Sequence, residues 1–502
     1  MVALLASAWL HDDAFVTLRT IDNALDGRGL RWNPVERVQA YTHPLWLGLL
    51  TGVIAATGEL EVTTLVVSMC LSLLTVYLVV FHVARTVTAG CVFALVLLLS
   101  KGFVDYATSG LEDPLTRLLL VVFVLLLLRS SSRPGSFGVL ALLAALGALS
   151  RPDALLVFLP ALGLELWRSE ARARSVVAGI CGLLPLALWG LFALLYYGAP
   201  WPNTAYAKLG GGVPQVGRLL QGLSYLLDSL IRDPMTPVVI IAASVVVVRH
   251  GGARARALLH GGHLYLLYVV WIGGDYMSGR FLGLPLLAAV VALARTEAPP
   301  LSRRARLAAV ALACLLVVPR LVEPLIQDEV GVFGIGDERR VHHPYTGLVY
   351  AFGGGRWPEH SLRLVGEEVA ARGTVHTDGA IGMVGFYAGP EAHIVDIFAL
   401  SDPLLARLPA KVGATFNRPH RWTWRPGHLW RPIPDGYLDS LPAEPNRITD
   451  PDLAAYYDVL RLVTRGPIWE HERLHAIVDL GLGRYDHLRE SYVARHPELF
   501  RE

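Results

Sequence analysis

Charged residues are scarce in this chain. Asp, Glu, Lys and Arg make up 17% of the 502 residues, whereas hydrophobic residues make up 53%. A wholly soluble protein of this size needs more polar groups to cover its surface, so this class is excluded. Lipid is therefore expected to be the solvent for a large part of the chain.

Lysine and cysteine are rare as well. The lysines are Lys101, Lys208 and Lys411, and the cysteines Cys70, Cys91, Cys181 and Cys314 all lie in apolar segments. A thiol in such a segment behaves as a small hydrophobic group. The sequence therefore gives no disulfide framework and no metal knuckle.

Several familiar signatures are absent from the sequence. It has no phosphate-binding glycine loop before a Lys-Ser or Lys-Thr pair, no dinucleotide fingerprint and no paired-histidine zinc motif. The net charge of +2 comes from short basic clusters balanced by acids, which argues against nucleic acid as a partner.

Long apolar runs lie almost entirely before Arg320, and the remaining sequence has the mixed composition of a folded soluble domain. We therefore expect a transmembrane domain over residues 1–320 and a soluble α/β domain over residues 321–502. Because a span needs about 20 apolar residues, or fewer inside a bundle, the candidate spans are 60–84, 88–104, 115–130, 136–150, 153–168, 176–197, 235–249, 258–274, 282–297 and 305–320.

Two N-terminal segments are apolar but short. Residues 1–10 make half a span, which indicates a tilted or partial helix or a true start upstream of Met1. Residues 44–57 are expected to stay on the outer surface as a juxtamembrane or re-entrant helix. These assignments predict a polytopic helical membrane protein with about eleven transmembrane helices.

Arginine clusters predict the orientation of the bundle, because positively charged loops stay on the cytoplasmic side. Each pair of successive clusters is separated by two candidate spans. Loops 105–114, 151–153, 198–214 and 273–280 and the C-terminal domain are therefore expected outside the cell. The clusters are Arg129 and Arg133; Arg168, Arg172 and Arg174; Arg249, Arg254 and Arg256; and Arg303, Arg304 and Arg306.

Local patterns predict further elements. Residues 12–26 have apolar residues at helical spacing and polar ones opposite, as in a helix that lies on the membrane surface. In the C-terminal domain we expect strands at 373–378, 383–387 and 393–398 and helices at 361–371, 450–465 and 484–495.

Asp12 and Asp13 follow an apolar segment on the expected outer face. A carboxylate there can take a proton from a sugar hydroxyl while a lipid-linked donor stays in the membrane. The structural alternative is that one of them only caps the helix that follows. Both are candidate catalytic residues, and one can cap while the other acts as base.

Glu112 and Asp113 form a second acidic pair in the next outer loop. They could bind a divalent cation or substrate hydroxyls, or they could simply cap the helix that begins near Pro114. No metal is required by the chemistry that we expect, and a divalent cation at the acidic loops is the alternative.

Two cations on the outer face are candidates for binding a phosphate. Lys208 is a compact ammonium where topology requires no positive charge, and Arg280 can bind phosphate oxygens with its two-pronged guanidinium. The alternatives are a lysine that reaches lipid headgroups and a salt bridge from Arg280 to Asp275. In the C-terminal domain, Trp424 and His428 belong to an aromatic and basic stretch that suits sugar binding or packing against the membrane domain.

These residues carry a resemblance to the GT-C glycosyltransferases, whose first outer loop holds an acidic pair. The segments His11–Phe15, Gly29–Pro34 and Tyr41–Trp46 resemble the AftB-type terminal arabinofuranosyltransferase branch. The resemblance continues through 109–113, 202–208, 274–280, 382–396, 402–407 and 425–428. Gln39, Ala40 and His43 depart from the pattern.

The resemblance implies a GT-C fold in the plasma membrane and an inverting transferase of cell wall biogenesis. It implies a polyprenyl-phosphate sugar donor, arabinofuranose first and another sugar such as mannose as the alternative, and a cell-envelope polysaccharide acceptor. An outer-loop aspartate would be the base. Donor or acceptor contacts are expected at Arg19, His43, Trp46, Glu112, Asp113, Tyr206, Asp275, Trp424 and His428.

A transporter or flippase is the rival interpretation from another class. It would favour charges near the middle of the membrane and broken helices. Here the acids cluster at the outer ends of spans, and a large external domain follows. The pattern therefore favours the transferase.

Overall fold

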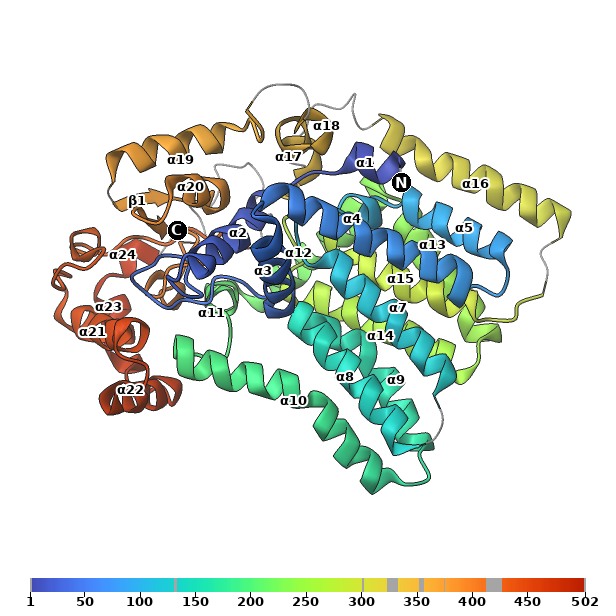
Figure 1. Cartoon of the computed structure of the whole chain (residues 1–502), viewed down its shortest axis with the longest axis horizontal. Coiled ribbons are helices and arrows are strands. Elements are labelled where there is room, and N and C mark those ends of the chain that lie inside the picture. The colour runs from blue at the N-terminus through green and yellow to red at the C-terminus, as the bar shows by residue number, and fades with distance from the viewer. Residues whose placement is uncertain are drawn as a thin grey trace.

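The computed structural model describes residues 2–130, 133–299, 302–322, 333–351, 356–373, 375–411 and 427–500. These residues form a mostly helical protein, with a bundle on one side and the C-terminal helices on the other (Figure 1). The apolar helices fit the predicted membrane glycosyltransferase fold.

The bundle consists of helices from the N-terminal two thirds of the chain. Several end where a glycine adopts a positive φ, as at Gly58 (72°), Gly198 (77°) and Gly273 (96°), because such a residue stops a helix without a Cβ clash. The helices are α3 (Pro44–Thr57), α4 (Glu61–Leu78), α5 (Val87–Leu99), α7 (Asp113–Arg129), α8 (Pro134–Ser150), α9 (Leu155–Arg168), α10 (Arg172–Tyr197), α12 (Gln215–Arg232), α13 (Met235–His250), α14 (Ala253–Ile272), α15 (Gly283–Ala294) and α16 (Arg303–Val322).

Helix α15 is at the centre of the bundle. Nearly every residue in it is buried, including Leu286, Leu287, Val290 and Val291. It packs against α13, α14, α7 and α5. A helix that is apolar on all sides needs such a position, because no face of it suits water.

In the part of the chain that the structure describes, two helical stretches have the length and apolarity of membrane spans, Glu61–Val83 and Arg172–Tyr197. Helices α12 and α13 are bent by 103° and would add a third if they form one broken span. Shorter apolar helices include α3, α5 and α8. The number of spans, about eleven, stays a prediction, as does the outer position of α3.

The loops of the bundle gather in groups that agree with the arginine pattern. Arg254 pairs with Glu165 at 2.8 Å and donates to the Ser130 carbonyl, which joins three of the basic turns. At the loops expected outside, Glu112 pairs with both Arg151 and Arg280. Loops assigned to one side therefore contact each other.

Among the described residues after 320 there is one parallel pair of strands, β1 (Val375–Asp378) and β2 (His393–Asp396), with Asp378 opposite Asp396. Helices make up most of the described structure after residue 320. They are α17 (Glu338–Thr346), α18 (Leu348–Ala351), α19 (Ser361–Arg372), α20 (Ile381–Ala388), α21 (Pro451–Arg465), α22 (His471–Gly481), α23 (Asp486–Arg495) and α24 (Pro497–Phe500).

The predicted helices at 361–371, 450–465 and 484–495 are confirmed by α19, α21 and α23. The predicted strands at 373–378 and 393–398 are confirmed by β1 and β2. The predicted strand at 383–387 is wrong, because these residues form α20. Parallel strands need a crossover between them, and a helix is its usual form. The β-branched and aromatic residues of this segment therefore pack in a helix.

Helix α2 (Asp12–Leu25) confirms the predicted helix, but part of its polar side is buried. Thr17 and Asn23 are buried, and α20 lies against α2. Arg19 donates to the carbonyls of Gly385 and Ala392. Helix α2 is thus an interior helix that joins the bundle to the C-terminal part of the chain, and the boundary near residue 320 stays a prediction.

Candidate active site

The predicted acidic pair lies at the start of α2. His11 is the residue that caps this helix, because its Nδ1 accepts the backbone N–H of Asp13 at 2.9 Å. Neither Asp12 nor Asp13 is needed for this cap. The side chains of both aspartates are therefore available for other contacts.

Asp12 caps a different helix, far away in the sequence. Its carboxylate accepts the backbone N–H of Gly382 at 3.1 Å and that of Met383 at 2.7 Å, at the start of α20. A Cβ at position 382 would lie 1.9 Å from the Asp12 carbonyl oxygen, so only glycine fits there. Both carboxylate oxygens of Asp12 are thus used to hold α20 against α2.

The Asp13 side chain is 37% exposed. Its Oδ2 accepts the hydroxyl proton of Tyr276 at 3.0 Å. Burial acts to raise the pKa of Asp13, but nearby positive charge, including that of Arg280 and Lys208, outweighs burial and holds the pKa below its usual value. Asp13 is therefore an ionised acceptor at neutral pH.

A cavity of about 530 Å³ opens beside Asp13. Six of the predicted site residues line it: Asp12, Asp13, His43, Lys208, Arg280 and His428. The C-terminal part of the chain supplies one wall, with Ala380, Phe398 and Leu400 among its residues. The ring of His428 meets that of Tyr276 edge to face, with centroids 4.2 Å apart. Tyr276, the hydrogen-bond partner of Asp13, therefore packs against the C-terminal wall of the cavity.

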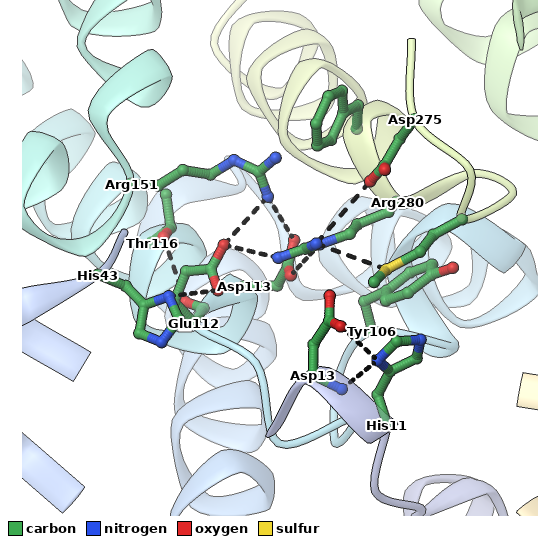
Figure 2. A network of polar contacts seen from close by, with 12 residues as sticks. His11, Asp13, His43, Tyr106, Glu112, Asp113, Thr116, Arg151, Asp275 and Arg280 are labelled. Atoms are coloured by element: carbon green, nitrogen blue, oxygen red, sulfur yellow. Dashed lines mark hydrogen bonds and ion pairs between the residues drawn. The ribbon is translucent and has the colours of Figure 1, made fainter. Parts of the chain in front are cut away.

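A buried ion network supports the cavity from the bundle side (Figure 2). Arg280 donates to Glu112 at 2.9 Å and to Asp113 at 3.3 Å, and its Nη1 lies 3.8 Å from Asp275. Arg151 adds a contact of 3.3 Å to Glu112. Because both cations are held on carboxylates, the network fixes the loops that form the cavity.

The same network keeps Glu112 ionised. Burial acts to raise its pKa, but nearby cations, chiefly Arg280 and with it Arg151, lower it to about 2. The Glu112 side chain makes no capping bond to α7, so the capping alternative is wrong for this residue. With Arg280 and Arg151 as its neighbours, the Glu112–Asp113 pair is already neutralised by protein cations, and a divalent cation there would meet positive charge.

His43 connects the network to α2. Its Nε2 lies 2.8 Å from the Thr17 hydroxyl, and its Nδ1 lies 3.4 Å from Glu112. Burial, together with Arg280 and Arg151, outweighs the pull of Glu112 and lowers the pKa of His43. His43 is therefore a neutral hydrogen-bonding group in the cavity wall.

His11, Glu338 and His342 offer the donor atoms of a metal site, all within 4.8 Å of one another. The tautomer of His11 argues against a metal there. Its Nδ1 accepts the Asp13 N–H and is unprotonated, so the neutral ring carries its proton on Nε2, the atom that faces Glu338. A protonated Nε2 has no lone pair for a metal ion.

Other predicted site residues lie away from the cavity. The Arg19 guanidinium is buried against Trp32 and bonds backbone carbonyls. The indole of Trp46 donates to the Gly110 carbonyl in the core. Tyr206 packs under Arg407 in a separate small hollow, and Trp424 lies outside the described residues.

The sequence did not single out Tyr276, Glu338, His342 or His360, all of which line the cavity. Tyr276 stands between Asp275 and Arg280, so its neighbours gave a usable signal. Glu338 and His342 gave a weaker one, an acid and a histidine four residues apart on α17.

Comparison with known proteins supports the resemblance to the arabinofuranosyltransferase branch. The chain is 30% identical over 329 residues to a terminal β-(1→2)-arabinofuranosyltransferase of Mycobacterium tuberculosis, which is 55% of this chain and 51% of that protein. A protein of the same description from Corynebacterium glutamicum is 29% identical over 324 residues, 56% of this chain and 47% of that protein.

The chain thus spans about half the length of the curated relatives that it matches. No family model matches the chain. No solved structure matches it either.

Proposed function

We propose that this chain is an inverting glycosyltransferase that moves a sugar from a polyprenyl-phosphate donor to a cell-envelope polysaccharide. The observation that carries the proposal is the position of Asp13, an ionised carboxylate in a cavity that also holds the cations Lys208 and Arg280. A base and a site for an anionic leaving group are the two parts that such a reaction requires.

In the proposed reaction an acceptor hydroxyl loses its proton to Asp13 as its oxygen attacks the anomeric carbon of the donor. A bond forms between these two atoms, and the bond from the anomeric carbon to the phosphate oxygen breaks. The polyprenyl phosphate leaves with the electron pair of that bond. Since one face of the carbon is attacked while the other loses the phosphate, the configuration inverts.

Lys208 is the stronger candidate for binding the phosphate. It makes no hydrogen bond or ion pair with any other described residue, so its ammonium is available to a ligand. Arg280 is occupied by Glu112 and Asp113, but it lines the cavity and adds to the positive potential there. General base catalysis contributes typically ~10²–10⁴ in rate, so these cations must supply a large share of the remainder.

We assign supporting roles to the other residues near the cavity. His43 and His428 line the cavity, and we propose them as contacts for donor or acceptor hydroxyls, whereas Glu112, Asp113 and Asp275 hold Arg280. Asp12 holds α20 and does not take the proton. No metal is required in this scheme.

The donor sugar is proposed from the relatives, which are terminal arabinofuranosyltransferases. Arabinofuranose is accordingly the first candidate, and another polyprenyl-linked sugar such as mannose is the second. We also propose a multi-pass plasma-membrane protein with about eleven spans, a membrane domain over 1–320 and an extracytoplasmic domain over 321–502.

The test is transfer by the purified protein with a panel of polyprenyl-phosphate sugars labelled in the sugar. Release of polyprenyl phosphate together with a labelled polysaccharide product supports the proposal, and the donor that reacts fastest identifies the sugar. Movement of the labelled donor across a vesicle membrane without cleavage would favour a flippase.

A further inference from the structure

Helix α17 is fastened to the segment that carries His11 and Asp13. Asp337, at its start, accepts from Lys101 at 2.6 Å. Near its other end, the Thr346 hydroxyl donates to the Leu10 carbonyl at 2.7 Å and accepts the Leu10 N–H at 3.2 Å. The position of α17 is therefore coupled to the residue that precedes His11.

Glu338 lies on this helix between two histidines. Its Oε2 is 3.4 Å from Nε2 of His11 and 3.5 Å from Nε2 of His342. The side chains of Glu338 and His11 are 6% and 2% exposed, so water does not compete for this contact. His342 is stacked on Trp9, which keeps the cluster in place.

His11 links this cluster to Asp13. Its Nδ1 accepts the Asp13 N–H, which requires the proton of the neutral ring to be on Nε2, the side that faces Glu338. A carboxylate beside one ring nitrogen stabilises the tautomer with the proton on that nitrogen. Glu338 thus favours the one tautomer of His11 that can cap α2.

We propose that Glu338 is a positioning residue that acts through His11 to orient Asp13 toward the cavity. The inference rests on the proposed function, in which Asp13 is the base. Without Glu338 the proton of His11 can move to Nδ1, where it opposes the Asp13 N–H. The first turn of α2 then loses its cap, and the carboxylate loses its fixed direction.

Transfer kinetics of Glu338→Ala and Glu338→Gln test this role. In the alanine variant we expect kcat to fall about 10²-fold, the loss that a misplacement of about 1 Å causes in an active site, with KM for donor and acceptor unchanged. Gln should restore most of kcat, because its amide oxygen can take the place of the carboxylate oxygen that lies 3.4 Å from Nε2 of His11. A higher KM with kcat unchanged would mean that Glu338 contacts substrate and would overturn the proposal.

A metal at this cluster predicts a different outcome. Both variants would then lose activity equally, since an amide is a poor replacement for a carboxylate ligand. Activity would also depend on added Zn²⁺ and fall with a chelator. This combination would contradict the positioning role.

A double-mutant cycle tests whether the effect passes through His11. Asn caps helices well, so His11→Asn should keep much of the activity while removing the link to Glu338. In that background Glu338→Ala should cause no further loss, because the two residues act as one unit. A full additional loss would show that Glu338 acts by another route.

A spectroscopic measurement keeps the inference testable even if the wild-type protein shows no transfer. In ¹⁵N-histidine-labelled protein, with the signal assigned through His11→Asn, Nε2 of His11 should be protonated and Nδ1 should not. Wild-type protein with the expected tautomer but no transfer would count against the proposed function alone. A proton on Nδ1, or a shift of the signal on adding Zn²⁺, would overturn the role of Glu338.

Discussion

The carboxylate of Asp12 binds the backbone N–H of Gly382, a residue 370 positions later in the chain. The contact joins the first turns of α2 and α20, and the cavity opens beside it. The two acids therefore have different roles. The Asp12 carboxylate is bonded to the start of α20, whereas the Asp13 carboxylate is open to the cavity. The base and the wall opposite it are therefore set by the same helix contact.

Replacing Gly382 with alanine should separate the two helices. The added Cβ would lie 1.9 Å from the Asp12 carbonyl oxygen and 2.8 Å from its carboxyl carbon. Overpacking of this kind costs typically 1–3 kcal/mol. We expect a lower midpoint of thermal unfolding in detergent and loss of transfer. Gly481→Ala is the control, because a Cβ there meets nothing within 4 Å, and an equal effect of both variants would contradict the argument.

Asp13→Asn and Asp12→Asn should affect different properties of the protein. The first should lower transfer, and the second should lower stability. Asp13→Asn removes the proton acceptor but leaves its Tyr276 contact possible, so transfer should fall ~10²–10⁴-fold with little change in stability. Asp12→Asn can accept with one atom only, so one N–H of α20 loses its partner at a cost of about 1–3 kcal/mol. Parallel measurements of transfer and thermal unfolding separate the two. Retained transfer in Asp13→Asn would refute its role as base.

Removal of the Lys208 ammonium should weaken donor binding without harming the fold. The side chain is exposed and has no described carboxylate partner, so Lys208→Met should leave thermal unfolding unchanged. We expect KM for the polyprenyl-phosphate donor to rise about 10-fold, the order of one charge-assisted contact. Arg484→Met, which removes an exposed charge paired with Asp479, is the control. An unchanged donor KM in Lys208→Met would show that the phosphate binds elsewhere.

Much of this arrangement was accessible from the sequence, since the helices of the bundle follow from apolar runs and the acidic pair from its place after one of them. The partner of Asp12 was not, because a cap formed by a side chain 370 residues away leaves no local pattern. The helix at Ile381–Ala388 was missed for a related reason, as tertiary contacts override β propensity. Arg19 was predicted to contact the donor or acceptor because it is a charged residue near the acids. Its guanidinium instead donates to carbonyls of α20 and of the loop that follows it.

Neutralising Glu112 should destabilise the protein by the same amount at every ordinary pH. Its pKa is about 2 in the folded state and ordinarily 4.5, so the stability it contributes is complete above pH 4.5 and is lost as pH falls toward 2. Glu112→Gln leaves Arg280 and Arg151 buried with less negative charge, at a cost of up to about 3–5 kcal/mol. Thermal unfolding at pH 5.5 and pH 8 should show equal losses. Glu367→Gln, on a half-buried surface pair with Arg363, should change little.

Asp402 should make the stability of the protein depend on pH in the opposite direction. Burial and the nearby Glu36 carboxylate raise its pKa to about 7, although the Leu405 N–H and the Tyr437 hydroxyl donate to it. The folded state therefore binds a proton that the unfolded chain, with a pKa near 3.8, releases. The stability from this group is complete below pH 3.8 and is lost as pH rises through 7.

The unfolding midpoint should accordingly fall between pH 5 and pH 8 in the wild-type protein, and by less in Asp402→Asn. Asparagine cannot ionise, yet its oxygen can still accept the two backbone N–H groups of Leu404 and Leu405. Part of the fall with pH should remain in this variant, because burial also raises the pKa of Asp396, to about 6. The exposed Asp439 provides the matched control, and Asp439→Asn should follow the wild-type curve. A slope unchanged in Asp402→Asn would mean that this carboxyl is ionised throughout the range, with its proton uptake not linked to folding.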